Sequence, residues 1–212
     1  MLENTRSKQP RDCQGDHVKL WKRLPLAGEK AIHHRPAVFL LVMLPPMMRC
    51  DMINFIQENF RYENGVLYRT TNRGGEKIGT AAGWLTACNG RPYWKISINK
   101  KTMYLHHIIF LLHHGFLPDY IDHKDGDSTN NMIENLRAAT QSQNMANSAM
   151  KSSNTSGYKG VTFRKDTKKW ASAIMVNGKH ISLGSHKTKE DAHAAYVLGS
   201  KKHFGEFARA TL

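Results

Sequence analysis

The stretch from residue 120 to residue 150 limits what this chain can fold into more than any other part of it. Its sequence is YIDHKDGDSTNNMIENLRAATQSQNMANSAM. Residues 121–123 are predicted to form a short strand, in which Asp122 and His123 point to opposite faces. The next eight positions, 124–131, are dense in residues that favour turns, so they are predicted to form a loop.

The second half of the stretch predicts a return strand and a helix. Residues 133–137 can pair back onto the first strand. Thr140-Gln141-Ser142-Gln143 has the pattern of a capping box, which places Asn144 in the first turn of a helix. We therefore expect a strand–loop–strand–helix unit that brings Asp122 and Asn144 together.

The polar residues of this unit suit the hydrolysis of a phosphodiester. A metal must neutralise the phosphate and the departing oxygen, and a rigidly held base must activate water. Asp122 and Asn144 offer hard oxygen ligands for Mg²⁺ or Mn²⁺, and His123 has an unperturbed pKa close to neutral. Taken singly, each could be an ordinary turn, surface or capping residue. Their combination favours a hydrolytic metal site.

Charge and cysteine content limit the partners and the compartment. Lys and Arg number 31 against 17 Asp and Glu, a formal net charge of +14, which favours a polyanionic partner such as nucleic acid. The three cysteines are widely spaced without a C-x-x-C pattern, which argues for a reducing compartment and against cysteine-bound zinc. The apolar run 37–44 is too short to span a membrane. We therefore predict a soluble, intracellular protein.

The rest of the first 120 residues divides in two. Residues 1–51 lack a sustained hydrophobic period and are predicted to be a disordered, basic extension, or an arm that touches nucleic acid. After them we predict a short amphipathic helix over 52–60, hairpins at Asn64-Gly65 and Asn89-Gly90, and a buried helix over 106–114 that ends at a glycine.

The last third predicts a small sheet backed by a helix. Residues 151–157 are polar and are predicted to be a flexible linker. Strands are expected over 158–164, 168–176 and 179–183, followed by a helix capped by Thr188. The chain as a whole is therefore predicted to be of the α+β class.

The run D-H-x-x-G-D-x-x-x-N-x-x-x-N-L-R, followed by T-x-S-x-N, resembles the HNH endonucleases of phage and intron homing type, in their His-Asn-Asn form. The resemblance covers residues 52–150 and implies a ββα-metal nuclease core. It implies that His123 is the general base, that Asp122 and Asn144 bind one Mg²⁺ or Mn²⁺ ion per active site, and that Asn135 spans the loop by side-chain hydrogen bonds. We also predict that His106 and Arg137 contact DNA, His106 through a phosphate or through the active-site loop.

Residues 156–209 are similar to the Apetala-type, or ethylene-response-factor, DNA-binding domain. The similarity lies in S-G-Y-K-G-V-x-x-R-K-x-x-x-K-W-x-A-x-I and in the N-G-K-x-I-x-L-G pattern that follows it. It implies that the sheet docks in the major groove. The residues on or near that face are Lys159, Arg164, Lys165, Trp170 and Lys179. Trp170 could instead be a core aromatic and the lysines a solvated face. Thr162 and Ser182 stand where plant relatives often carry Arg and Trp, so the base preference should differ or be weaker.

These observations together predict a two-module, metal-dependent endonuclease that cuts double-stranded DNA. We expect 52–150 to hold the nuclease and 158–212 to bind DNA, in a monomer or homodimer without a small-molecule cofactor or membrane association. If the chain is phage-encoded, it would act in the host cytoplasm. A DNA-binding, transcription-factor-like protein with an inactive nuclease fold is the main alternative, and an RNA-binding protein a weaker one.

Overall fold

The computed structural model describes residues 46–72, 75–88 and 90–209, and the statements below concern those residues. Residues 1–45 of the extension predicted over 1–51 lie outside them. Helix α2 spans Pro46–Asn59, so it begins before the predicted boundary at residue 52. Proline is well accommodated at the first helical position, where its missing N–H would have no intrahelical partner.

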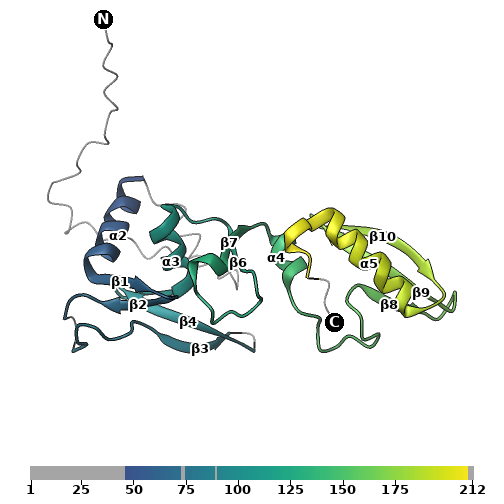
Figure 1. The fold of residues 1–212 in the computed structure, drawn as a ribbon, viewed down its shortest axis with the longest axis horizontal. Helices are drawn as coiled ribbons and strands as arrows, with labels where there is room; N and C mark the ends of the chain where they lie inside the picture. The colour runs from purple at the N-terminus through teal and green to yellow at the C-terminus, as the bar shows by residue number, and fades with distance from the viewer. Residues whose placement is uncertain (1–45, 73–74, 89, 210–212) are drawn as a thin grey trace, which may run out of the picture. The chain divides into compact units, whose positions relative to one another are not determined.

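Two small antiparallel sheets follow α2 (Figure 1). The first is the hairpin of β1 (Phe60–Glu63) and β2 (Val66–Arg69). The second has the order β3-β4-β5, with strands Trp84–Cys88, Arg91–Ile98 and Lys101–Tyr104. The predicted turn at Asn64-Gly65 is confirmed, since both residues have positive φ, 47° and 82°.

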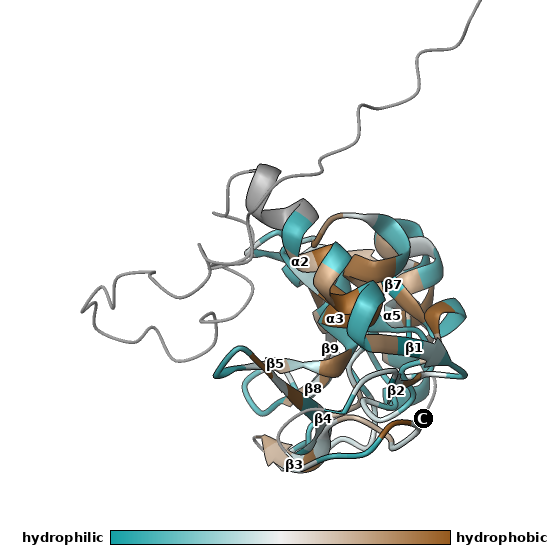
Figure 2. Cartoon of the chain, turned by 90° about the vertical axis from the view of Figure 1, so that its left-hand side faces the viewer, coloured by the Kyte–Doolittle hydropathy of each residue, from teal (hydrophilic) through white to brown (hydrophobic). Residues whose placement is uncertain are grey.

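Helix α3 (Leu105–His114) is buried along most of its length. Ile108 and Ile109 have no exposed surface, and Figure 2 shows hydrophobic residues along this helix. The predicted glycine end is confirmed, because Gly115 has φ 72° and donates its N–H to the Leu111 carbonyl. Across the described ranges, no helix combines the length and the apolar character needed to cross a membrane.

The central unit consists of β6 (Tyr120–His123), the 3₁₀ turn η2 (Ile133–Asn135), β7 (Leu136–Ala139) and α4 (Gln141–Asn147). The capping box is confirmed: Thr140 accepts from the Gln143 N–H, and the Gln143 side chain accepts from the Thr140 N–H. The prediction of a strand over 133–137 is wrong for its first half. Residues 133–135 form a turn because the Asn135 side chain bonds into the loop rather than lying in a ladder.

The C-terminal part confirms the predicted sheet and helix. Strands β8 (Val161–Arg164), β9 (Lys169–Val176) and β10 (Lys179–His186) form an antiparallel sheet in the order β10-β9-β8. Helix α5 (Lys189–Phe204), capped by Thr188, packs on it and is followed by the 3₁₀ turn η3 (Gly205–Phe207). Gly199 allows the close approach, since a Cβ there would lie 2.7 Å from the Leu183 methyl groups.

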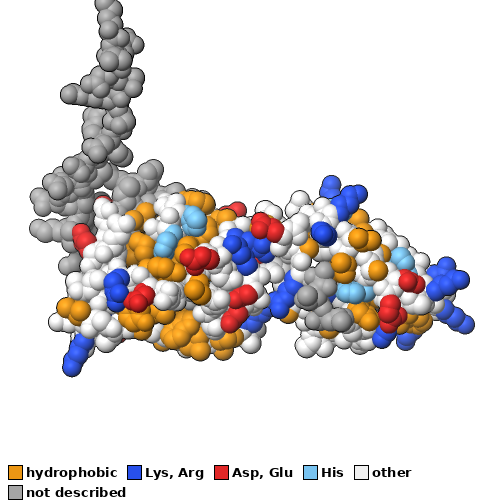
Figure 3. Space-filling model, viewed as in Figure 1, with side chains coloured by type: hydrophobic (Ala, Val, Ile, Leu, Met, Phe, Trp, Pro, Cys, Tyr) orange, Lys and Arg blue, Asp and Glu red, His pale blue; other side chains and the backbone are white. Residues whose placement is uncertain are grey.

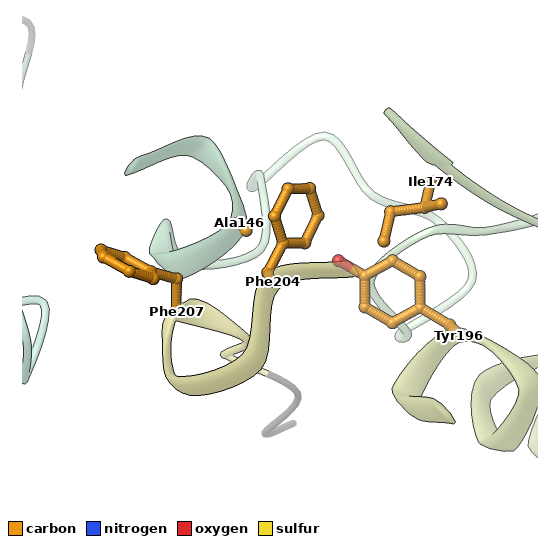
Figure 4. Packing of buried hydrophobic residues seen from close by; sticks show 5 residues of the cluster. All are labelled: Ala146, Ile174, Tyr196, Phe204 and Phe207. Atoms are coloured by element: carbon orange, nitrogen blue, oxygen red, sulfur yellow. The ribbon is translucent and has the colours of Figure 1, made fainter. Parts of the chain in front are cut away.

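A hydrophobic cluster joins α4 to the C-terminal sheet and helix. Its members are Ala146, Ile174, Tyr196, Phe204 and Phe207 (Figure 4). Because Ala146 belongs to α4 and the other four to the C-terminal part, the two predicted modules share a core.

The segment predicted as a flexible linker is also organised by hydrogen bonds. The Asn154 side chain accepts from the N–H groups of Ser156 and Gly157 and donates to the Tyr158 carbonyl. The Lys159 ammonium then donates to the Ala146 and Ser148 carbonyls at the end of α4. The connection therefore has a defined path between the two parts.

Removal of the Phe204 ring should show that the shared core stabilises the fold. Phe204 is 8% exposed, so Phe204→Ala is expected to lower the free energy of unfolding by about 3–5 kcal/mol, as for other buried aromatics. Leu198, on the same helix, is 71% exposed, and Leu198→Ala should change that free energy by less than about 0.5 kcal/mol. Urea unfolding of both variants measures the contrast, and equal losses would contradict it.

Candidate active site

Asp122 is a buried carboxylate that two donors hold in place. The β6–β7 register sets it opposite Arg137, whose Nε and Nη2 lie 2.9 Å and 2.8 Å from Asp122 Oδ2. Asn147 Nδ2 lies 2.9 Å from Oδ1 and 3.0 Å from Oδ2. Asp122 is 4% exposed. Among the residues described, Oδ1 accepts from Asn147 alone, so it keeps lone-pair capacity for a further partner.

Asn147 fixes the last turn of α4 against β6. It is 4% exposed, and its Nδ2 also donates to the His123 carbonyl at 2.7 Å. Sequence reasoning correctly expected α4 to reach Asp122, but it assigned that reach to Asn144. Asn144 is half-buried one turn earlier on the same helix, and its contact with Asp122 as a metal ligand remains a prediction. The signal for Asn147 was its spacing of three residues from Asn144, which keeps both on one helical face.

His123 is 7% exposed and is oriented by Asn131. Its Nε2 lies 3.2 Å from the Asn131 Oδ1. An amide oxygen only accepts, so Nε2 carries the hydrogen and Nδ1 holds the free lone pair. Burial lowers the pKa of His123, and the bond to Asn131 and the charges of the nearby aspartates, Asp125 first, oppose that shift. The imidazole is therefore neutral near pH 7, as a general base requires.

Two asparagines, Asn135 and Asn131, make side-chain hydrogen bonds that link the loop after β6 to itself and to His123. Asn135 Nδ2 donates to Asp125 Oδ1 at 3.0 Å and to the Asn130 carbonyl at 2.9 Å, and its Oδ1 accepts from the Asp125 N–H at 3.1 Å. These are bonds across the loop of the kind that the resemblance implies for Asn135. The ring of His123, however, is hydrogen-bonded to Asn131, which is 2% exposed. The sequence predicted no role for Asn131.

His106 lies beside the candidate base in the interior. Its ring centroid is 5.0 Å from that of His123, and its ring stacks on Tyr104 at 5.4 Å. Its Nδ1 is buried and makes no hydrogen bond within the described part of the chain. Burial, followed by the neighbouring His107 and His123, lowers the pKa of His106 well below 6.5. Burial lowers that of His107 to about 4. His106 is thus a neutral neighbour of His123.

Arg137, predicted to contact DNA, is partnered inside the protein. Only 10% of its side chain is exposed. Besides its bonds to Asp122, its Nη1 donates to the Glu206 carbonyl at 3.1 Å, and its guanidinium lies 3.7 Å above the Phe207 ring. Arg137 therefore links the carboxylate of β6 to η3, a contact that the sequence did not suggest.

The other predicted DNA-binding residues have two kinds of surroundings. The Lys159 ammonium lies 2.5 Å and 2.6 Å from the carbonyls of Ala146 and Ser148, and burial is the main reason that its pKa falls to about 8. Trp170 is half-buried with its ring centroid 5.0 Å from that of Phe163. The remaining three are exposed: Arg164, Lys165 and Lys179. Figure 3 shows Lys and Arg side chains gathered at the end of this part of the molecule.

The donor set at Asp122 fits a hard divalent cation. It offers a carboxylate oxygen with a free lone pair, beside a helix that carries amide oxygens. In the part of the chain that the structure describes, no three His, Cys, Asp or Glu side chains converge as a metal-holding group. A cation held by Asp122 would therefore take its other ligands from amide oxygens, water or substrate.

Comparison with known proteins gives two matches. Residues 103–146 match the family model described as HNH endonuclease. Protein 3.8 of Escherichia phage T7 is 36% identical to this chain over 90 residues, which cover 42% of this chain and 74% of the phage protein. No solved structure matches. The family segment contains Asp122, His123, Asn131 and Asn144 but ends before the C-terminal sheet, so neither match supports an Apetala-type domain there.

A pair of asparagine variants should separate a structural contact from a ligand on α4. Asn147→Ala removes the donor to Asp122 Oδ1 and one of the donors to the His123 carbonyl, so it should lower the free energy of unfolding by about 1–3 kcal/mol. Asn144→Ala removes no side-chain hydrogen bond to the residues described and should change that free energy by less than about 0.5 kcal/mol. Chemical unfolding without added metal compares the two variants. An equal loss of free energy of unfolding in both would contradict the prediction that Asn147, and not Asn144, makes a structural contact.

The buried histidines should make stability depend on pH. His106, His107 and His123 have folded-state pKa values below the ordinary 6.5, so the unfolded chain binds protons that the folded chain excludes. Stability should therefore fall as the pH drops from 6.5 towards 5, with a slope approaching about 4 kcal/mol per pH unit if all three stay neutral. Urea unfolding at several pH values measures this slope. His106→Phe should reduce this slope, and an unchanged slope in that variant would contradict the prediction.

Proposed function

Since the chain belongs to one family with Protein 3.8 of Escherichia phage T7 and carries an HNH endonuclease domain over residues 103–146, we propose that it cuts double-stranded DNA with the help of one divalent metal ion. The observation that carries this proposal is the state of His123. Its ring is buried and neutral, it is aimed by Asn131 through Nε2, and it is adjacent in sequence to a carboxylate with a free lone pair.

In this proposal His123 is the general base. Its Nδ1 accepts a proton from a water molecule, and the oxygen of that water attacks phosphorus while the bond from phosphorus to the 3′ oxygen breaks. The departing oxygen is protonated by solvent, which leaves 3′-hydroxyl and 5′-phosphate ends, as the family resemblance implies. The charges of Asp122, Asp125 and Asp127 favour the imidazolium that forms.

Asp122 and Asn144 would hold the metal ion, Mg²⁺ or Mn²⁺, through oxygen atoms. When bound, the ion would neutralise charge on the phosphate and on the departing oxygen. Arg137 and Asn147 would keep the Asp122 carboxylate in one orientation, because both donate to it from different elements. Asn135 would keep the loop rigid through its bonds to Asp125 and Asn130.

The sheet of β8, β9 and β10 would hold the duplex. Its exposed Arg164, Lys165 and Lys179 and the net charge of +14 support phosphate contacts by this sheet. The similarity of residues 156–209 to Apetala-type domains supports docking through the sheet, with Trp170 on its central strand. Cleavage and binding would then lie in parts of the chain that share one hydrophobic core.

A plasmid assay tests the proposal. The wild type, incubated with supercoiled plasmid and Mg²⁺ or Mn²⁺, should produce nicked or linear DNA. His123→Ala should reduce the single-turnover rate by about 100- to 10,000-fold, the usual contribution of a general base. His203→Ala, which removes an exposed histidine on α5, should cut at the wild-type rate.

Binding measurements on the same variants separate the alternatives. His123→Ala should bind duplex DNA as tightly as the wild type, since the change affects chemistry rather than docking. A wild type that binds duplex DNA but never cuts it with either metal would instead be a DNA-binding protein with an inactive nuclease fold. Displacement of duplex DNA by RNA at lower concentration would favour an RNA-binding protein.

A further inference from the structure

An arginine from the end of the chain lies against the loop that follows His123. Gly126 has φ 76°, and a Cβ added there would overlap Nη1 of Arg209. The Gly126 N–H donates to the His123 carbonyl at 2.9 Å, so this glycine belongs to the turn that closes β6. The absence of a side chain at position 126 makes the space that the Arg209 guanidinium fills.

The position of Arg209 is set by its neighbours in the chain. Phe207 is buried in the shared core, and the Ala208 N–H donates to the Gly205 carbonyl at 3.2 Å. Arg209 therefore follows an anchored residue by two positions. It is half-buried, which fits a side chain that lies along the surface of the loop rather than pointing into solvent.

The guanidinium of Arg209 has no hydrogen-bond or ion-pair partner among the residues described. The carboxylates nearest in the loop are committed to the loop itself. Asp125 accepts from the Asp127 N–H, Asn130 and Asn135, and Asp127 accepts from the N–H and hydroxyl of Thr129. A partly buried guanidinium thus lies against the turn that follows His123 and forms no ion pair with the residues described.

The charge of Arg209 also acts on a second cation, Lys159. The positive charge of Arg209, after burial, contributes to the lowered pKa of Lys159. Two like charges held together raise the free energy of the folded chain, and an anion placed between or beside them would lower it. The surroundings therefore suit an anion that arrives from outside, and a guanidinium binds a phosphate through two parallel N–H donors.

We propose that Arg209 binds a DNA phosphate next to the one that is cut, and so supplies a substrate-binding side chain to the nuclease site from outside the matched segment 103–146. This inference rests on the proposed function. It gives the C-terminal part a role at the point of cleavage in addition to holding the duplex through its sheet.

Charge-removing variants test the inference. Arg209→Gln should weaken duplex binding or slow single-turnover cleavage by about 10- to 100-fold, the range for a lost charged hydrogen-bonding group, and should reduce the slope of log K against log salt by about 0.9. Arg209→Lys keeps the charge but lacks the two parallel N–H donors of a guanidinium. It should therefore keep the wild-type salt slope and lose part of the cleavage rate. Lys202→Gln, which removes an exposed charge from α5, should change neither.

A substrate series identifies the phosphate. Methylphosphonate, which removes one phosphate charge, is placed in turn at each position around the cleavage site. At one position beside the cut, the wild type should fall to the level of Arg209→Gln, while the variant should be unaffected. If Arg209→Gln matches Lys202→Gln in slope and rate, or loses activity equally with every substrate, the inference is wrong.

The same measurements keep the inference separate from the proposed function. A wild type that binds DNA without cutting it would overturn the nuclease proposal, and the salt slopes of Arg209→Gln and Arg209→Lys would still decide whether Arg209 binds a phosphate. Thermal unfolding checks that both variants fold. If Arg209→Gln does not fold, Arg209→Lys decides alone. A wild-type salt slope with a reduced cleavage rate in that variant supports the phosphate contact. A wild-type slope together with a wild-type rate overturns it.

Discussion

The ion pair between Asp122 and Arg137 is the contact on which the rest of the site depends. It joins β6 to β7 within the buried interior, and Arg137 extends it to η3 through Glu206 and Phe207. Burying two charges carries a desolvation cost that the pair only partly offsets, and removing one partner of such a pair typically costs about 3–5 kcal/mol. A plain apolar pair would hold these strands as well. The charged pair also holds the Asp122 carboxylate in one orientation, which suits the metal-binding role proposed for it.

Helix α4 connects that carboxylate to the C-terminal sheet. Its last turn presents Asn147 to Asp122 on one side and Ala146 to the shared core on the other. Lys159 then caps the end of the same helix by bonding to the Ala146 and Ser148 carbonyls. A helix of seven residues is too short to be stable alone. Its place is therefore set by contacts with both parts, and a change in either core should move the asparagines.

Turns and helix caps could be predicted because residues close in the sequence specify them. The hydrogen-bond partners of the site residues could not, because tertiary contacts determine them. The Asn64-Gly65 turn and the Thr140 capping box are specified by residues within four positions of each other, so the sequence alone predicted them correctly. The bond from Asn131 to His123 depends on the path of a whole loop, and that from Asn147 to Asp122 on the rotation of α4. Polar composition predicted a flexible linker over 151–157. The course of this segment could not be predicted from the sequence, because it depends on the bonds from Lys159 to the end of α4, and the residues around Lys159 do not indicate those bonds.

An amide that orients His123 suits the role of general base that we propose for this residue. A carboxylate bonded to Nε2 would hold the ring equally well, but its charge would favour the protonated imidazole and raise the pKa. Asn131 fixes the ring through an uncharged oxygen, and burial lowers the pKa of His123 although the bond to Asn131 and the nearby aspartates oppose that shift. The charges of the loop aspartates favour the imidazolium, while both oxygens of Asp125 and Oδ1 of Asp127 accept hydrogen bonds within the loop. Orientation and charge stabilisation are thus assigned to different residues, and this separation allows His123 to be both rigidly held and neutral.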